Sequence, residues 1–264
     1  MVVGKELHSE HCKVEYLTIR HTFGMVVGEA ISTVRWMPDI FNVFPLTIYV
    51  DKVNSYEIYK EDFYKLYPKY DYVENERSNT VSEGQVDPLI HLEPSLNPLF
   101  TEIADHVRSY IHDTLKFRDI FNITFTKTWL SRMRDCKEIP LHIHSTSHIS
   151  FVYYLNTPPN SHRLTFHNPH CSNSLFKTST SDKGIADMNM VEEYNLLNSN
   201  TFYLNPQEGY VILFPSSVLH GTESVVSDFK GERLAIVGDI TLILKEEHIH
   251  FTNGYVNQKY WRQF

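Results

Sequence analysis

The sequence has few cysteines, no long apolar run and no excess of positive charge. Its three cysteines, Cys12, Cys136 and Cys171, are scattered and lack CxxC spacing. This pattern is typical of a reduced compartment rather than of a disulfide framework. No apolar run approaches the roughly 20 residues that a membrane-spanning helix needs, and no signal peptide is recognisable at the N-terminus. We therefore expect a soluble cytoplasmic protein.

The charge balance argues against nucleic acid as a binding partner. Lysine and arginine number 24 against 32 aspartates and glutamates, for a formal net charge of −8. With no Lys/Arg-rich run, the chain has no electrostatic footprint for nucleic acid. A local positive pocket could still hold an acidic substrate, because net charge says nothing about one site.

The residues that are present predict a β-rich domain. At 264 residues, the chain fits one large domain or two small ones. Hydrophobic residues at 42% suffice for a sizeable core, and aromatics at 13% suit a β-rich one. From Asn122 onward, short apolar segments alternate with turn residues: NITFTKTWLSRM, LHIH, HISFVYYLN, HRLTFHNP, TFYLN, GYVILFP, TESVVS and RLAIVGDITLIL. Such a succession predicts an antiparallel sandwich or a jelly roll.

Helices are expected ahead of these strands. Asn42–Val53 reads as a strand, and Ser55–Tyr67 has apolar residues at about helical spacing. Residues 70–95 are polar and contain proline, which predicts a long loop. After Pro98, an i, i+4 apolar stripe predicts an amphipathic helix packed on a sheet; its members are Leu99, Ile103, Val107, Ile111 and Leu115.

The chain divides into parts of different character. Residues 1–40 form an N-terminal extension of uncertain structure, and residues 41–264 form the main domain. Within it, the polar stretch Cys171–Asn200 interrupts the strands as a long insertion. Loops of this length are often lids or binding loops, so we expect this one to select the substrate.

The segment LHIHSTSH clusters three histidines before an aromatic strand. In a β-strand His142 and His144 point the same way, about 7 Å apart, so both could reach one metal ion. The chain has 15 histidines, so an HxH pair also arises by chance and is often a surface pair. A distal segment adds a Gly-led apolar strand, a proline and then His220, with Arg233 at the start of another apolar strand.

This order resembles that of the Fe(II)- and 2-oxoglutarate-dependent oxygenases, especially their prolyl-hydroxylase-like branch and relatives with an HxH motif. The likeness runs from about Phe41 to Leu244 and is carried by FVYYLN, GYVILFPSSVLHG, ERLAIVGDI and FNVFPLTIYVD. It implies a mainly β double-stranded β-helix (jelly roll, cupin-like) with flanking α-helices. It also implies Fe(II), with 2-oxoglutarate as cosubstrate and dioxygen, in the hydroxylation of a C–H bond.

The resemblance makes His142 the first iron ligand and His220 the distal one. His144 takes the place where most of the family has an aspartate. Two histidines and a carboxylate leave three open positions on Fe(II), and an imidazole instead leaves the site with one more positive charge. His148, or a water, is the alternative third ligand. Imidazoles also bind nickel, copper and zinc.

By the same resemblance, Arg233 binds the distal carboxylate of 2-oxoglutarate through two charge-assisted hydrogen bonds, and the Tyr154 hydroxyl adds a contact. From the residues alone, Tyr154 is more often core and Arg233 a surface arginine beside Glu232. Many relatives have a serine two residues after the arginine, where this chain has Ala235.

Other residues are weaker candidates. Asn168 and His170 occupy positions near the mouth of the site in relatives, and Trp129 either lines the pocket or packs in the core. His248 and His250 form a second HxH pair, which reads as C-terminal surface because no Gly-led distal motif follows it.

Two other functions stay open. One is a cupin-type metal-dependent dioxygenase or isomerase that does not use 2-oxoglutarate, which suits four possible histidine ligands. The other is a non-catalytic β-domain that binds a ligand or partner. The substrate of the oxygenase could be an amino acid, a peptide or a small metabolite, and the sequence leaves the oligomeric state undetermined.

Overall fold

The computed structural model describes residues 43–69, 72–74, 79–81, 89–134, 138–169, 173, 175, 176, 178–223, 231–251 and 262. The chain divides into two units, Met1–Pro45 and Leu46–Phe264. The expected N-terminal extension, residues 1–40, lies outside the described residues, as do all three cysteines and His170. The elements below all belong to the second unit.

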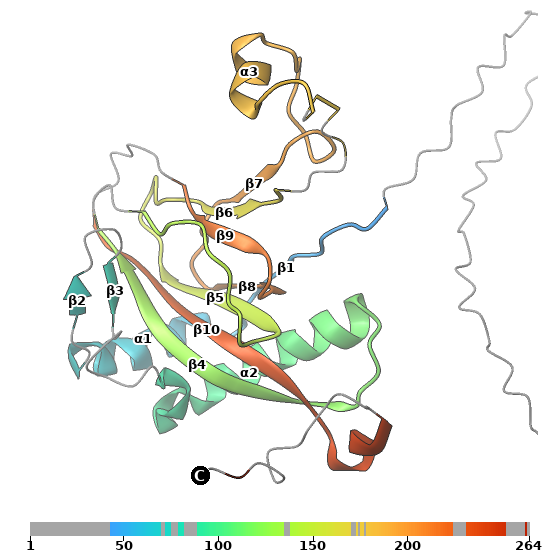
Figure 1. Ribbon diagram of the computed structural model, residues 1–264. Coiled ribbons are helices and arrows are strands. Elements are labelled where there is room, and N and C mark those ends of the chain that lie inside the picture. Colours follow the sequence, from blue (N-terminus) through green and yellow to red (C-terminus); the bar gives the residue numbers. More distant parts are fainter. Residues whose placement is uncertain are drawn as a thin grey trace, which may run out of the picture. The chain divides into compact units, whose positions relative to one another are not determined.

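Two antiparallel sheets form this unit (Figure 1). The large sheet has the order β1-β8-β5-β10-β4-β3-β2, and the small sheet has the order β7-β6-β9. The strands of the large sheet are β1 (Tyr49–Lys52), β2 (Tyr72–Glu74), β3 (Asn79–Val81), β4 (Phe121–Met133), β5 (Ile149–Asn156), β8 (Tyr210–Pro215) and β10 (Arg233–Leu244). Those of the small sheet are β6 (Leu164–His167), β7 (Thr201–Leu204) and β9 (Leu219–Thr222).

The path of the chain between the sheets defines the fold. After β4 in the large sheet, the chain crosses to the small sheet, where His142 makes an isolated antiparallel bridge with His220 of β9. It returns for β5, crosses back for β6 and β7, and then alternates through β8, β9 and β10. The last strand, β10, inserts between β4 and β5. This is the double-stranded β-helix, or jelly roll, and it confirms the expected fold class.

Strand β5 is buried on both faces, which explains its continuous apolar sequence. Phe151, Tyr153 and Leu155 face the helices and pack in the larger core cluster. Val152 and Tyr154 face the small sheet and pack in a second cluster with residues of β6 and β8. The strand therefore separates a structural core from the space between the sheets.

Helices cover the outer face of the large sheet (Figure 1). In the expected amphipathic helix, Leu99, Ile103, Val107 and Ile111 are buried, and Leu115 packs against them, so this prediction is confirmed. The helical elements are α1 (Tyr56–Leu66), η1 (Tyr67–Lys69), η2 (Ile90–Leu92), η3 (Pro94–Leu96), α2 (Asn97–Arg108), a π-helical turn η4 (Ser109–Thr114), α3 (Asp182–Asp187) and η5 (Glu246–Phe251). No helix in the described part of the chain is long and apolar enough to span a membrane.

Two expectations about local structure were wrong. Residues 70–95 were expected to form a loop, but they contain β2, β3, η2 and η3. Elements of three residues are too short for a periodic pattern, and β3 is positioned by a pairing to β4 through Thr80 and Ser131. The LHIH segment was expected to be a strand but makes only the single bridge at His142.

The polar stretch before Asn200 connects β6 to β7, which pair with each other. The backbone N–H of Asn168 donates to the carbonyl of Asn200 at 2.8 Å, which closes the base of this connection. The connection contains the short helix α3, whose N-terminus is capped by the Ser181 hydroxyl. Its role in selecting a substrate stays a prediction.

Gly238 lies in the middle of β10, between β4 and β5. A Cβ there would lie 2.6 Å from the carbonyl oxygen of Lys127 and 2.7 Å from the ring of Phe151. We expect Gly238→Ala to lower the free energy of unfolding by about 1–3 kcal/mol, because the paired strands cannot separate without losing hydrogen bonds. Urea unfolding measures this change, and an unchanged midpoint would contradict it.

Candidate active site

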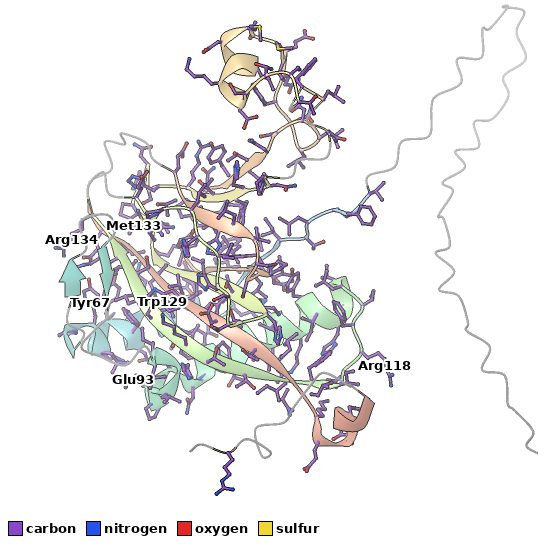
Figure 2. All side chains as sticks on the ribbon, viewed as in Figure 1. Tyr67, Glu93, Arg118, Trp129, Met133 and Arg134 are labelled. Carbon is purple, nitrogen blue, oxygen red and sulfur yellow. The ribbon has the colours of Figure 1, made fainter. Side chains whose placement is uncertain are left out.

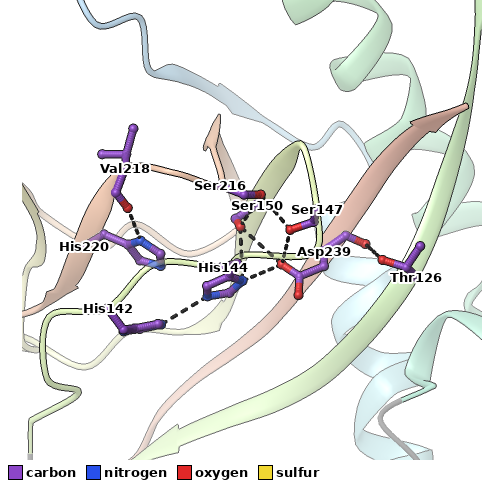
Figure 3. A network of polar contacts seen from close by, with 9 residues as sticks. All are labelled: Thr126, His142, His144, Ser147, Ser150, Ser216, Val218, His220 and Asp239. Atoms are coloured by element: carbon purple, nitrogen blue, oxygen red, sulfur yellow. Dashed lines mark hydrogen bonds and ion pairs between the residues drawn. The ribbon is translucent and has the colours of Figure 1, made fainter. Parts of the chain in front are cut away.

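Three histidines converge between the two sheets (Figure 3). His142 and His144 precede β5, His220 lies on β9, and one ligand nitrogen from each lies within 4.8 Å of the others. The bridge that joins His142 to His220 has N–H···O distances of 2.8 and 3.0 Å. The backbone pairing of the small sheet thus brings together side chains that are far apart in the sequence.

The local backbone orients the first two histidines. Leu141 and Ile143 are about half exposed, at 46% and 53%, whereas His142 and His144 turn inward. This is the alternation expected of an extended segment. Opposite this segment, a Cβ on Gly221 would lie 2.6 Å from the carbonyl oxygen of Ile139. Glycine at this position therefore lets β9 approach the segment that carries the two histidines.

Hydrogen bonds determine which imidazole nitrogen could bind a metal. The Nδ1 of His142 lies 2.8 Å from the carbonyl oxygen of Pro140, and that of His220 lies 2.8 Å from the carbonyl oxygen of Val218. A carbonyl only accepts, so Nδ1 carries the hydrogen and Nε2 the lone pair. The Nε2 atoms of His142 and His144 are 3.1 Å apart. Lone pairs that converge in this way fit a metal ion, so the donor set suits a divalent first-row metal.

Burial keeps His220 in the form that binds metal. Loss of solvation lowers the pKa of His220 to about 3, against the opposing effect of its hydrogen bond to Val218. The neighbouring imidazoles of His142 and His144 contribute to this lowered pKa. At neutral pH this imidazole is uncharged, as a metal ligand must be.

Asp239 is part of this cluster, and the sequence interpretation missed it. Its carboxylate accepts a hydrogen bond from Nδ1 of His144, and the hydroxyls of Ser147 and Ser150 donate to the same oxygen at 3.1 and 3.2 Å (Figure 3). Burial alone would raise the pKa of Asp239, but His144, Ser147 and Ser150 lower it overall. One signal was available: an acidic residue within the otherwise apolar strand RLAIVGDITLIL.

The hydrogen bond between Asp239 and His144 places a carboxylate next to the imidazole that stands where the resembling oxygenases have an aspartate. Where most of the family has an aspartate in contact with the metal, this chain has an imidazole whose far nitrogen donates to an aspartate. A carboxylate hydrogen-bonded to a ligating histidine fixes its tautomer and increases its basicity. The negative charge of a carboxylate is thus still present near the cluster, but it lies behind the imidazole of His144.

His148 lies apart from the cluster. Its side chain is exposed, and its Nδ1 accepts a hydrogen bond of 2.9 Å from the backbone N–H of Leu242. The geometry therefore favours His144 over His148 as the third ligand. The second HxH pair begins in η5 with His248, and the side chain of His250 lies outside the described residues.

Arg233 is the second charged group of the site. It is only 2% exposed, its Nη2 donates to the Tyr154 hydroxyl at 3.0 Å, and its Nη1 lies 2.9 Å from the sulfur of Met133. Its Nε has no hydrogen-bond partner, and no carboxylate among the described residues forms an ion pair with it. Glu232, the neighbour expected to accompany it at the surface, pairs instead with Arg132 and Arg134.

A cavity of about 340 Å³ lies between the histidine cluster and Arg233. Arg233 and the three histidines all line it, and Trp129, which projects from β4 as does Met133 (Figure 2), forms part of its wall. The remaining wall is largely apolar, with Ile139, Pro140, Val152, Leu164, Phe214, Ala235 and Val237 among its members. A buried cation without an anionic partner is costly, so the cavity suits an anionic ligand that reaches the metal position. Asn168 lines a different cavity, of about 1100 Å³, beside the β6–β7 connection.

The choice between His144 and His148 can be tested by metal binding. We expect His144→Ala to lose most Fe(II) affinity in anaerobic titration, and His148→Ala to bind as the wild type does. The reason is that only His144 directs its Nε2 toward His142. Loss of affinity in His148→Ala alone would contradict the assignment.

The role of Asp239 can be tested in the same titration. Because its carboxylate orients and polarises His144, we expect Asp239→Asn to lower metal affinity by about 10–100-fold. Asp62→Asn is the matched control. Asp62 lies on α1, and Lys65 is the one described residue that donates a hydrogen bond to its carboxylate. Equal affinity in both variants would show that Asp239 has no role in metal binding.

Comparisons with known proteins give similar solved structures and one matching family. The structure is similar to a prolyl-4-hydroxylase of Pseudomonas putida (12% identity, 74% of this chain and 92% of that chain, TM-score 0.46). It is also similar to HygX of Streptomyces hygroscopicus, solved with nickel, 2-oxoglutarate and hygromycin B (14%, 74% and 83%, TM-score 0.49). These scores lie below 0.5, and the strand topology defines the fold without them. None of the curated proteins matches the chain. Residues 127–239 match the model of the putative 2OG-Fe(II) oxygenase family. This range contains the three histidines, Asp239 and Arg233, and the match confirms the resemblance to that family that the motifs in the range indicate.

Proposed function

We propose that the protein is a non-haem Fe(II)- and 2-oxoglutarate-dependent dioxygenase that hydroxylates a C–H bond. The observation that carries this proposal is that Arg233, which is buried and pairs with no carboxylate among the described residues, lines the same cavity as three converging histidines. A ligand with a carboxylate at one end and metal-binding oxygens at the other would satisfy both groups. 2-Oxoglutarate is such a ligand, and the description of the matching family includes it.

The residues divide the task of binding. His142, His144 and His220 would hold Fe(II) and leave other positions open for the 2-oxoacid and dioxygen. Arg233 would bind the distal carboxylate, since its planar guanidinium can donate two parallel hydrogen bonds. Tyr154 already contacts Arg233 and would add its hydroxyl to the same carboxylate.

Fe(II), if held by these histidines, would supply the redox chemistry of the reaction: one oxygen atom of dioxygen enters succinate as 2-oxoglutarate loses carbon dioxide, and the other enters the C–H bond of the substrate to give the alcohol. The protein's own part is to orient the reactants and to exclude competing reactions. Phe214, Val237 and Trp129 line the cavity with apolar surface and limit the access of water. Asp239 and its serine donors keep His144 in one orientation.

The substrate belongs to a broad class: an amino acid, a peptide or a small metabolite. The cavity of about 1100 Å³ beside the β6–β7 connection supports a role for this connection in selecting it. Phe176 and Tyr194 line this cavity together with Asn168 at the end of β6. The cytoplasm stays the predicted compartment, on the cysteine pattern of the sequence.

The other functions make different predictions about Arg233. A cupin-type metal enzyme without 2-oxoglutarate needs the histidines but not the arginine, and a non-catalytic β-domain needs neither. Burying a guanidinium without an anion destabilises the protein unless a ligand uses it. This cost favours the 2-oxoglutarate-dependent enzyme over both alternatives.

The proposal can be tested by anaerobic titration of the apoprotein with Fe(II), with and without 2-oxoglutarate. We expect the weak visible charge-transfer band of an iron-chelated 2-oxoacid. Arg233→Ala should lose the band at cosubstrate concentrations that saturate the wild type, because the distal carboxylate has lost its charged partner. Arg134→Ala is the control, since this arginine pairs with Glu232 outside the cavity.

The other outcomes separate the alternatives. Iron binding without the band would support the cupin-type enzyme. No metal binding at all would exclude both enzymes and leave the non-catalytic domain.

A further inference from the structure

The residues beside Ala235 bear on the proposed cosubstrate site. Ala235 stands where many relatives have a serine that contacts the same carboxylate as the arginine. In the large sheet, Ala235 of β10 pairs with Tyr154 of β5 on one side and with Ser131 of β4 on the other. A hydroxyl side chain therefore flanks the alanine on each neighbouring strand.

Ser131 shares its face of the sheet with Arg233. Residues directly opposite in an antiparallel pair point to the same face, with Cβ atoms about 4.5–5.5 Å apart. Residues two apart on one strand also share a face, so Arg233, Ala235 and Ser131 all point the same way. All three line the cavity of about 340 Å³.

The hydroxyl of Ser131 is buried and unsatisfied. The residue is 2% exposed, and within the described part of the chain its Oγ has no hydrogen-bond partner. Burying a hydroxyl without a partner costs free energy. The Nε of Arg233, on the adjacent strand and facing the same cavity, also lacks a partner. Two unsatisfied donors on one wall fit an acceptor that the ligand supplies.

We propose that Ser131 provides, from the neighbouring strand, the hydroxyl that Ala235 lacks. Side chains of three neighbouring strands would then bind the distal carboxylate of 2-oxoglutarate: Arg233 of β10, Tyr154 of β5 and Ser131 of β4. This inference rests on the proposed function and identifies a further cosubstrate-binding residue that the sequence motifs do not include.

The test is the affinity of the anaerobic Fe(II) protein for 2-oxoglutarate, measured by the visible band and by calorimetry. Ser131→Ala should weaken binding by about 10-fold to 100-fold, the range for losing a hydrogen bond to a charged group. Adding Ala235→Ser to this variant should restore most of the affinity, because it returns a hydroxyl to the same face. Ser161→Ala is the matched control, since Ser161 is buried outside the cavity and its hydroxyl donates to Pro158.

A second ligand separates carboxylate binding from an effect on iron. 2-Oxobutyrate keeps the 2-oxoacid group but lacks the distal carboxylate, so wild type and Ser131→Ala should bind it equally. The apoprotein of Ser131→Ala should be at least as stable to heat as the wild type, because the substitution removes an unsatisfied buried hydroxyl.

The outcomes distinguish this inference from the proposed function. If the wild type binds 2-oxoglutarate and Ser131→Ala binds it as tightly, the inference is wrong and the function stands. Equal weakening of both 2-oxoacids, or a less stable apoprotein, would assign Ser131 a structural role and overturn the inference. If the wild type does not bind 2-oxoglutarate, the proposed function fails and the inference fails with it.

Discussion

The site depends on the antiparallel bridge between His142 and His220. Two backbone hydrogen bonds join the segment before β5 to β9. This bridge connects that segment to the small sheet. It brings His142 and His220, two candidate metal ligands from distant parts of the chain, next to each other. Gly221 permits the close approach of the two backbones. The same pairing that completes the fold thus creates the histidine cluster.

Strand β10 carries two charged residues of the site, Asp239 and Arg233, and their partners differ. Asp239 is hydrogen-bonded to His144 and to two serines within the protein. Among the described residues, the hydrogen-bond partners of Arg233 are the neutral side chains of Tyr154 and Met133. A carboxylate that is hydrogen-bonded to a histidine within the protein can orient that histidine as a metal ligand. A buried guanidinium without an anionic partner favours the binding of an anionic ligand in the cavity. This difference supports the proposed roles of Asp239 beside the histidine cluster and of Arg233 in binding the cosubstrate.

The sequence predicted secondary structure and burial correctly where apolar residues recur in a regular pattern. The i, i+4 stripe from Leu99 to Ile111 predicted a buried helix face, and the apolar run of β5 predicted a buried strand. It was uninformative for β2 and β3, whose short strands are positioned by pairing. Asp239 and Ser131 were missed because the role of a polar residue in a strand depends on its partners on other strands, which the sequence does not show.

By itself, the sequence determined the β-rich class, the helix on the sheet, and the candidates His142, His144, His220 and Arg233, because periodicity and motif order are local properties. Only the tertiary structure decided that His144 rather than His148 turns toward the cluster, that Asp239 accepts a hydrogen bond from His144, and that Ser131 flanks Ala235. Each of these depends on strand register, and register is set by packing and hydrogen bonds between segments that lie far apart in the chain.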